Sequence, residues 1–299
     1  MIHTNRIGAA RSDKWLYAVN YTFLTVVLII VLYPLIYIVS SSFSSIEAVV
    51  SGRVWLWPVE FSLEGYAAVF KHHLLLNSLK NSLYYMAVGT AINIVITVTS
   101  AYALSRKDLF GRNFFMMIFV FTMFFNGGLI PTYILVQKLG ILNTPWAIWL
   151  PLALIIWNMI IARTYFQTTL PQELLEAAQI DGCNDFLFLR KVVIPLSGPI
   201  IAVIALFYGV MHWNQYFNAM IYLRDPQLFP LQLVLREILI LSQMEFDMVA
   251  DADAVAAVVG LGELLKYSLI VVSALPLLIV YPFVQKFFVK GIMIGALKG

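Results

Sequence analysis

Residues 15–46 read WLYAVNYTFLTVVLIIVLYPLIYIVSSSFSSI, and none of these 32 residues is Asp, Glu, Lys or Arg. An α-helix needs about 20 apolar residues to cross the hydrocarbon core of a bilayer, where a charged side chain is costly. Five more uncharged segments reach about this length, at 81–105, 113–137, 139–162, 192–223 and 267–285. We therefore predict an all-α integral membrane protein with six transmembrane helices, at about 15–39, 79–104, 113–136, 145–166, 199–222 and 267–287.

The composition of the whole chain supports this class. Of its 299 residues, 61% are apolar, 14% aromatic and 12% charged, and the mean hydropathy is +0.86. Soluble domains carry about 25% charged residues, so this chain lacks the charge that a water-facing surface needs. Its net charge of +3 does not indicate a nucleic-acid partner, and its single cysteine, Cys183, excludes a disulfide framework.

The basic residues predict the orientation of the helices, because loops rich in Lys and Arg stay in the cytoplasm. The short connection Ser105–Arg112 carries three basic residues, whereas Gln137–Thr144 carries one. We therefore place both chain termini in the cytoplasm. Two long connections, at about 40–78 and 223–266, then face outward.

The outward connections carry three features of their own. Trp55 and Trp57 in the first suit an interfacial belt or a docking surface. Residues 231–241 of the second can form an amphipathic helix. The acidic stretch that follows has a spacing unlike an EF-hand and is interpreted as a solvated loop; it holds Asp247, Asp251 and Asp253.

The first segment is predicted to stay attached rather than to be removed as a signal peptide. Its apolar run is longer than a signal-peptide core, and no clear small-x-small cleavage site follows it. We predict one transmembrane domain over residues 1–299, with a core at about 77–290 and an N-terminal anchor helix at about 15–39.

Motifs for catalysis and nucleotide binding are absent from the sequence. It contains no G-x-x-x-x-G-K-[ST], no H-E-x-x-H and no G-x-S-x-G, and the adjacent pair His72-His73 fits an interfacial loop better than a metal site. The six segments also lack the ionisable groups that proton-coupled carriers place in mid-membrane. We expect a non-catalytic chain with no metal and no cofactor, which is either a passive pore or driven by a partner.

The connection 169–197 reads TLPQELLEAAQIDGCNDFLFLRKVVIPLS and predicts two short helices on the cytoplasmic face. Pro171 suits a first helical turn, Gly182 supplies a left-handed stop, Asn184 caps a second helix, and Pro195 ends it. The hairpin is either a docking element or a simple link between two spans. For docking, we expect the apolar anchors to be Leu174, Leu175, Phe186 and Phe188.

This connection resembles the EAA signature of the MetI-like permeases of ABC importers. The matching residues are Glu176, Ala177, Ala178 and Gly182, followed after nine residues by Val192-x-Ile194-Pro195; Asp181 fits the form found in sugar importers. Over about residues 15–299 the chain is similar to the second permease of maltose-type and oligosaccharide importers. Further similarity lies in Trp213, Asn214 and Phe217, in Gly291, and in Gly295–Gly299.

The resemblance implies a set of partners in the bacterial cytoplasmic membrane. A sibling permease would complete the pathway, two ATPase subunits would hold ATP and Mg, and a solute-binding protein would deliver an oligosaccharide outside. It implies that the EAA loop couples to an ATPase through Glu176, Ala177, Ala178, Asp181, Gly182 and Pro195. It also implies that a C-terminal tail contacts the ATPases through Gly295, Ala296 and Lys298, unless that tail is simply frayed.

Polar side chains within the spans are the candidates for contact with cargo. The densest cluster is in the fifth span, where Asn214 and Asn218 are expected to share a helix face. Amides and aromatic rings suit a neutral, hydroxyl-rich cargo, and an acidic sugar fits if Lys80 or Arg224 lines the mouth. The amides can instead bond neighbouring helices. The candidates are Trp213, Asn214, Gln215, Tyr216, Asn218, Asn126 and Asn158.

Three other functions are weighed against a sugar importer. A permease for an amino acid or peptide shares the EAA signature. A passive six-span channel would carry flux without ATP. A membrane-embedded enzyme is disfavoured because the spans contain no cluster of acids, bases or metal ligands.

Overall fold

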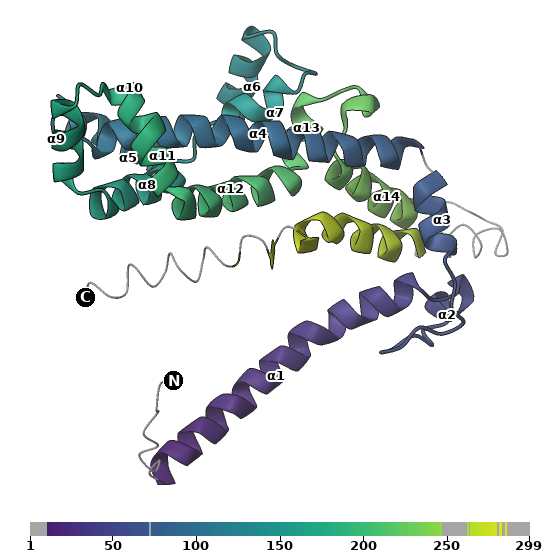
Figure 1. The fold of residues 1–299 in the computed structure, drawn as a ribbon. Coiled ribbons are helices and arrows are strands. Elements are labelled where there is room, and N and C mark those ends of the chain that lie inside the picture. Colours follow the sequence, from purple (N-terminus) through teal and green to yellow (C-terminus); the bar gives the residue numbers. More distant parts are fainter. Residues whose placement is uncertain are drawn as a thin grey trace. The chain divides into compact units, whose positions relative to one another are not determined.

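The computed structural model describes residues 11–71, 73–246, 262, 264–279, 281, 282 and 285 (Figure 1). The described residues form helices and no β-strand, which confirms the predicted all-α fold. They divide into two compact units, residues 1–71 with 238–272, and residues 72–237 with 273–299. Each unit is described by itself; that all residues form one domain stays a prediction.

The first unit begins with one long helix, α1 (Arg11–Ser42). Its segment Lys14–Ser42 is long and apolar enough to cross a membrane, as predicted for the N-terminal anchor. Large apolar side chains are exposed along most of the segment, from Trp15 to Leu35, for example Leu16, Phe23 and Ile30. A helix that is apolar all round needs an apolar environment, and lipid supplies one.

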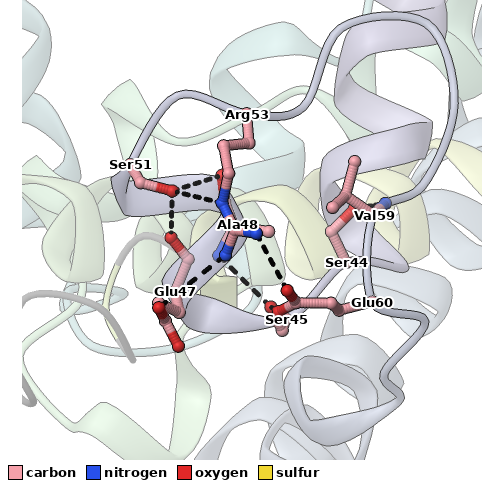
Figure 2. A network of polar contacts seen from close by, with 8 residues as sticks. All are labelled: Ser44, Ser45, Glu47, Ala48, Ser51, Arg53, Val59 and Glu60. Carbon is pink, nitrogen blue, oxygen red and sulfur yellow. Dashed lines mark hydrogen bonds and ion pairs between the residues drawn. The ribbon is translucent and has the colours of Figure 1, made fainter.

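A short polar hairpin follows α1 and surrounds α2 (Ile46–Val50). Figure 2 shows its contacts: the Ser45 hydroxyl accepts a hydrogen bond from the Ala48 N–H (3.2 Å) and donates to Glu60 Oε2 (2.6 Å). Arg53 Nη1 pairs with Glu60 Oε1 at 2.9 Å, and the bonds from Ser45 and Arg53 lower the pKa of Glu60. The connection that is predicted to face outward thus has a fixed hydrogen-bond network here, with α3 (Glu64–Lys71) beyond it.

Three helices form the core of the second unit: α4 (His73–Ser105), α8 (Ile156–Thr169) and α12 (Gly198–Trp213). Figure 1 shows α12 running beside α4. Their facing side chains form one buried cluster, which includes Val98, Ala101, Met159, Ala162, Phe166 and Ile204. The α4 segment Leu74–Ser105 is the second helix that is long and apolar enough to span a membrane.

Two predicted spans are broken rather than continuous. The third consists of α5 (Arg112–Phe124) and α6 (Leu129–Lys138), bent by 113° at a break where Gly128 has φ +82°. The fourth consists of α7 (Trp146–Trp149), the 3₁₀ turn η1 (Leu150–Leu152) and α8, bent by 54°. Pro151 lies in η1, where its nitrogen cannot donate to the preceding turn, and the bend itself falls between Leu152 and Ile156.

The second break frees backbone groups, and neighbouring helices satisfy them. Asn93 of α4 donates to the Leu152 carbonyl (2.5 Å), and the Tyr208 hydroxyl of α12 accepts from the Ile155 N–H (3.1 Å). Tyr208 also bonds Thr97 at 2.7 Å. Within a membrane such groups must find protein partners, so this break is tolerated only inside the bundle.

The fifth predicted span also differs from a single helix. The helix α12 ends at Trp213, and α13 (Phe217–Tyr222) begins only after three intervening residues. The Asn214 side chain bonds the Val210 carbonyl at 2.9 Å, a local bond that competes with continued helix. The expectation that Asn214 and Asn218 share one helix face was therefore wrong.

The described segments are compatible with six spans but do not establish that number. By length and composition, two helices qualify as membrane spans. The number rises to five if each of the three bent pairs counts as one span. The third pair joins residues 185–196 to α12 with a bend of 83°. The apolar helix Leu264–Ile279 covers the first part of the sixth predicted span. Beyond α13 lie η3 (Pro226–Leu228) and α14 (Leu231–Phe246). The helix α14 confirms the helix predicted at 231–241. The acidic residues Asp247, Asp251 and Asp253 lie outside the described residues.

Candidate functional site

The cytoplasmic hairpin predicted from the EAA signature starts with α9 (Gln172–Ile180), at one end of α4 (Figure 1). Gly182 has φ +77°, the left-handed conformation expected of a helix stop. Its N–H bonds the Gln179 carbonyl (3.0 Å), and the Cys183 N–H bonds the Ala178 carbonyl (2.9 Å). These two bonds form a Schellman motif, which closes α9 and fixes the turn.

The second helix of the hairpin is α10 (Asp185–Phe188). The Asn184 side chain accepts a hydrogen bond from the Leu187 N–H at 2.8 Å, which confirms it as the cap of this helix. Pro195 does not end the helix as predicted: a π turn, η2 (Leu189–Val193), leads into α11 (Ile194–Leu196). In that turn the Ile194 N–H bonds the Leu189 carbonyl five residues back, so the chain stays helical through Pro195 and ends one residue later, at Leu196.

The EAA residues divide between an outward face and an inward one. Glu176, Ala177, Asp181 and Gly182 are exposed, and Glu176 accepts a hydrogen bond from Gln172 at 3.0 Å. Ala178 is half-buried against the core of the second unit. A small residue is therefore needed at 178 for packing within the chain, whereas Ala177 is free to meet another surface.

The apolar anchors of the hairpin differ in part from those predicted. Leu174 and Phe186 are exposed, but Phe188 is 4% exposed and belongs to the core, and Leu175 packs against that core. Sequence reasoning missed Ile180, which is 87% exposed at the tip of α9. Its position three residues after Ala177, on the same helix face, is the signal that could have found it.

The predicted cargo residues of the fifth span do not form one surface. Trp213 is 1% exposed, and its indole N–H donates to the Ser273 carbonyl at 2.9 Å. Asn214 and Tyr216 are exposed, whereas Gln215 and Asn218 are half-buried. Trp213 thus holds the second unit together, and the two exposed side chains remain accessible to a cargo.

The two amides predicted elsewhere have different environments. Asn126 is exposed at the break between α5 and α6, where its side chain accepts from the Gly128 N–H at 3.0 Å. Asn158 is 3% exposed within α8. The predicted tail residues Gly295, Ala296 and Lys298, and Gly291, lie outside the described residues.

A buried polar chain lies between α4 and α12 beside these residues. His212 is 1% exposed, and its Nε2 lies 2.6 Å from Asn93 Oδ1. Because Asn93 uses its amide nitrogen on Leu152, its oxygen must accept, so His212 Nε2 donates. Nδ1 is then an acceptor, and the Gln215 side chain lies beside it, with its oxygen Oε1 placed 3.3 Å away. That amide satisfies Nδ1 when its NH₂ group faces the ring.

Two basic residues lie at the opposite end of α4 from the hairpin. Asn77 and Asn81 of α4 bond the Gln227 carbonyl at 2.6 and 2.7 Å, which holds the segment after α13 against that end. Lys80 in α4 and Arg224 after α13 are both exposed, and the exposed Asp225 directly follows Arg224. Two exposed basic side chains therefore belong to the end of the second unit that is predicted to face outward.

Known proteins similar to this chain point to one family. The sequence profile of the family described as "Binding-protein-dependent transport system inner membrane component" matches residues 93–294. The polygalacturonan/rhamnogalacturonan transport system permease protein YtcP of Bacillus subtilis (strain 168) is 42% identical over 285 residues, covering 93% of this chain and 96% of that protein. Protein LplC of the same organism is 40% identical over 280 residues, covering 94% of each.

A solved structure agrees with these relatives. A chain in the crystal structure of a bacterial ABC transporter involved in the import of the acidic polysaccharide alginate is 36% identical to this one, with a TM-score of 0.84. The match covers 94% of this chain and 99% of that one. The profile match spans more than half of the chain and includes the whole cytoplasmic hairpin. This protein therefore belongs to the family of binding-protein-dependent transport system inner membrane components.

Proposed function

We propose that this permease imports a carbohydrate oligomer and is driven by ATPase subunits that grip its cytoplasmic hairpin. One observation carries the proposal: the family match includes a hairpin whose turn is locked by the Schellman motif and whose tip exposes Ala177, Ile180 and Gly182. A closed, rigid element with a small and apolar tip suits insertion into a groove of a partner, and it can transmit a push without deforming.

The proposal includes the partners expected from the signature. A sibling permease completes the pathway, two ATPase subunits bind ATP and Mg and perform the hydrolysis, and a solute-binding protein delivers the cargo outside. The complex lies in the bacterial cytoplasmic membrane, with both termini of this chain in the cytoplasm. ATP binding favours one arrangement of the ATPases, and the hairpin passes that preference to the membrane helices.

A more specific cargo class is an acidic oligosaccharide. Lys80 and Arg224 at the outward-facing end support it, because cations concentrate anionic ligands near a mouth. The names of two similar proteins, for polygalacturonan and for alginate, point the same way. The amides and aromatic rings of the fifth span favour a neutral cargo, so the charge of the sugar decides between the two interpretations.

Reconstitution of the complete complex in proteoliposomes tests the cargo. Stimulation of ATPase activity is measured with neutral oligosaccharides and with uronate oligosaccharides of equal length. We expect carbohydrate to stimulate activity and amino acids and peptides to have no effect. Stimulation by uronates that falls with added salt supports the acidic class, whereas stimulation by neutral sugars alone refutes it.

Two substitutions test the hairpin. Gly182→Val forces a β-branched residue into a left-handed conformation, and Ala177→Glu places a charge on the docking face; we expect both to abolish uptake while the ATPases remain active. The matched control is Gly140→Val. Gly140 has φ +68° and closes a second Schellman motif at the end of α6, with N–H bonds from Gly140 to Gln137 (3.0 Å) and from Ile141 to Val136 (3.4 Å). Normal uptake by Gly182→Val and Ala177→Glu would refute the role of the hairpin.

A further inference from the structure

The base of the cytoplasmic hairpin is joined to α4 by one arginine that the EAA signature does not contain. Arg106 directly follows α4, and its side chain is 11% exposed. Its Nε and Nη2 donate to the two oxygens of Asp108 at 2.8 and 2.6 Å, within the same loop. Its Nη1 lies 2.9 Å from Asp185 Oδ1, at the start of α10, and 3.0 Å from the Tyr102 hydroxyl.

The three partners of Arg106 differ in what they connect. Asp108 holds the guanidinium in place, and the hydrogen bonds between them raise the pKa of Arg106 and lower that of Asp108. Tyr102 places its ring beneath the guanidinium, 5.9 Å from its centre. Only the bond to Asp185 leads from the end of α4 into the hairpin. The guanidinium makes four contacts to these three partners, two of them a fork to Asp108, whereas an ammonium group has only three donors on one atom.

An aromatic contact reinforces the same junction. Phe188, at the end of α10, is 4% exposed, and its ring centre lies 6.4 Å from that of Tyr102. Tyr102 thus contacts both Arg106 and α10. Beside the junction, a cavity of about 810 Å³ separates Glu176 and Gln179 of α9 from Arg106 and Asp108. Glu176 and Gln179 line this cavity, whereas Leu175 and Ala178 of α9 pack against the core cluster that includes Tyr102 and Leu104 of α4.

We infer that Arg106 is a positioning residue for transport, which through Asp185 passes the movement of the hairpin to α4. The inference rests on the proposed function of the hairpin. Movement of α9 reaches α10 through the closed turn at Gly182, and α10 is tied to α4 by the ion pair and by Phe188. The helix α4 packs along α8 and α12, so a shift of its cytoplasmic end reaches the core of the second unit.

The test compares the two carboxylates that share this guanidinium. Asp185→Asn weakens the bond between hairpin and α4, whereas Asp108→Asn weakens only the bond within the loop. In the reconstituted complex, uptake and ATP hydrolysis are measured together. We expect Asp185→Asn to lower the uptake per ATP by about tenfold, which corresponds to about 1.4 kcal/mol. Arg106→Lys should resemble it, while Asp108→Asn and the conservative Asp185→Glu should stay within about twofold of the wild type.

A second measurement separates this inference from the proposed function. Ile180→Cys in a Cys183→Ser background provides a single thiol at the exposed tip for crosslinking to the ATPase. We expect Asp185→Asn to keep this crosslink, because the tip still docks. Loss of the crosslink in Asp185→Asn would mean that Asp185 serves docking of the hairpin to the ATPase. Wild-type uptake per ATP in Asp185→Asn would mean that Asp185 serves neither docking nor the transmission of movement to α4. Either result overturns the inference. A missing crosslink in the otherwise wild-type chain would instead refute the proposed docking of the hairpin.

Discussion

Gly89 of α4 faces His212 of α12 so closely that an added methyl group has no room. A Cβ built at Gly89 would lie 2.5, 2.6 and 2.8 Å from Nε2, Cε1 and Cδ2 of the His212 ring. The ring cannot turn aside freely, because it is 1% exposed and is bonded to Asn93 at 2.6 Å. Gly89→Ala must therefore separate the two helices or displace the histidine.

The cost of Gly89→Ala follows from these two effects. Overpacking of a close interface costs about 1–3 kcal/mol, and a buried hydrogen bond lost from Asn93 adds about 1–3 kcal/mol. The helices can share the strain, so we expect the free energy of unfolding to fall by about 2–4 kcal/mol. Asn93 also satisfies the Leu152 carbonyl at the break before α8, so the break should become more mobile as well.

The α4–α12 interface offers a matched control. Gly209 lies in α12, and a Cβ there would be 3.8 Å from Thr90 Oγ1 and 3.9 Å from Met86 Cγ, which is ordinary contact. Gly209→Ala should raise the free energy of unfolding by up to about 1 kcal/mol, because alanine restricts the unfolded chain more than glycine does.

Equilibrium unfolding of the purified chain in mixed detergent micelles measures both variants. Adding His212→Ala to Gly89→Ala should relieve the overlap, so the two changes together should cost at least about 1 kcal/mol less than their sum. Equal stability of Gly89→Ala and Gly209→Ala would refute the close packing of His212 on Gly89.

Three further outcomes are expected. At Gly182 a Cβ would meet nothing within 4 Å, so only the left-handed backbone opposes substitution. Uptake should therefore fall in the order Gly182→Asn, Gly182→Ala, Gly182→Val, with a backbone strain of about 1–2 kcal/mol for Gly182→Ala. Equal uptake by all three variants would contradict this reasoning. Arg106 lowers the pKa of Asp108, so the contribution of Asp108 to stability is complete above about pH 4 and is lost as the pH falls through that lowered pKa. Asp108→Asn should therefore remove this loss of stability in acid from a plot of unfolding free energy against pH. An unchanged plot would argue against the Asp108–Arg106 bond. Ser45→Ala removes the cap of α2 and a hydrogen bond to Glu60. The free energy of local unfolding should fall by about 1 kcal/mol, so backbone hydrogen exchange in residues 46–50 should become faster. Unchanged exchange there would contradict the capping role.

Features that depend on neighbouring residues could be predicted from the sequence. Charge-free runs predict α1 and α4, and the residue types at Gly182 and Asn184 predict the helix stop and the helix cap that the structure contains. Each of these signals acts over a few residues, because a cap or a left-handed turn is decided by the nearest backbone groups.

The breaks in the spans could be predicted only in part. Pro151 lies just before one break, and apolar composition alone does not distinguish two bent helices from one straight helix at 113–136. The interruption after Trp213 was missed for the same reason. Hydropathy measures whether a segment tolerates lipid, and it says little about where its backbone bends.

The sequence by itself determined that this chain is helical and apolar and that a helical hairpin follows Thr169, because composition and local backbone preferences are written in consecutive residues. Only the tertiary structure decided which side chains meet across the fold. Asn93 and His212 are 119 residues apart, and Arg106 and Asp185 are 79 apart, yet each pair is in contact. Such contacts follow from the packing of whole helices, and no short stretch of sequence carries that information.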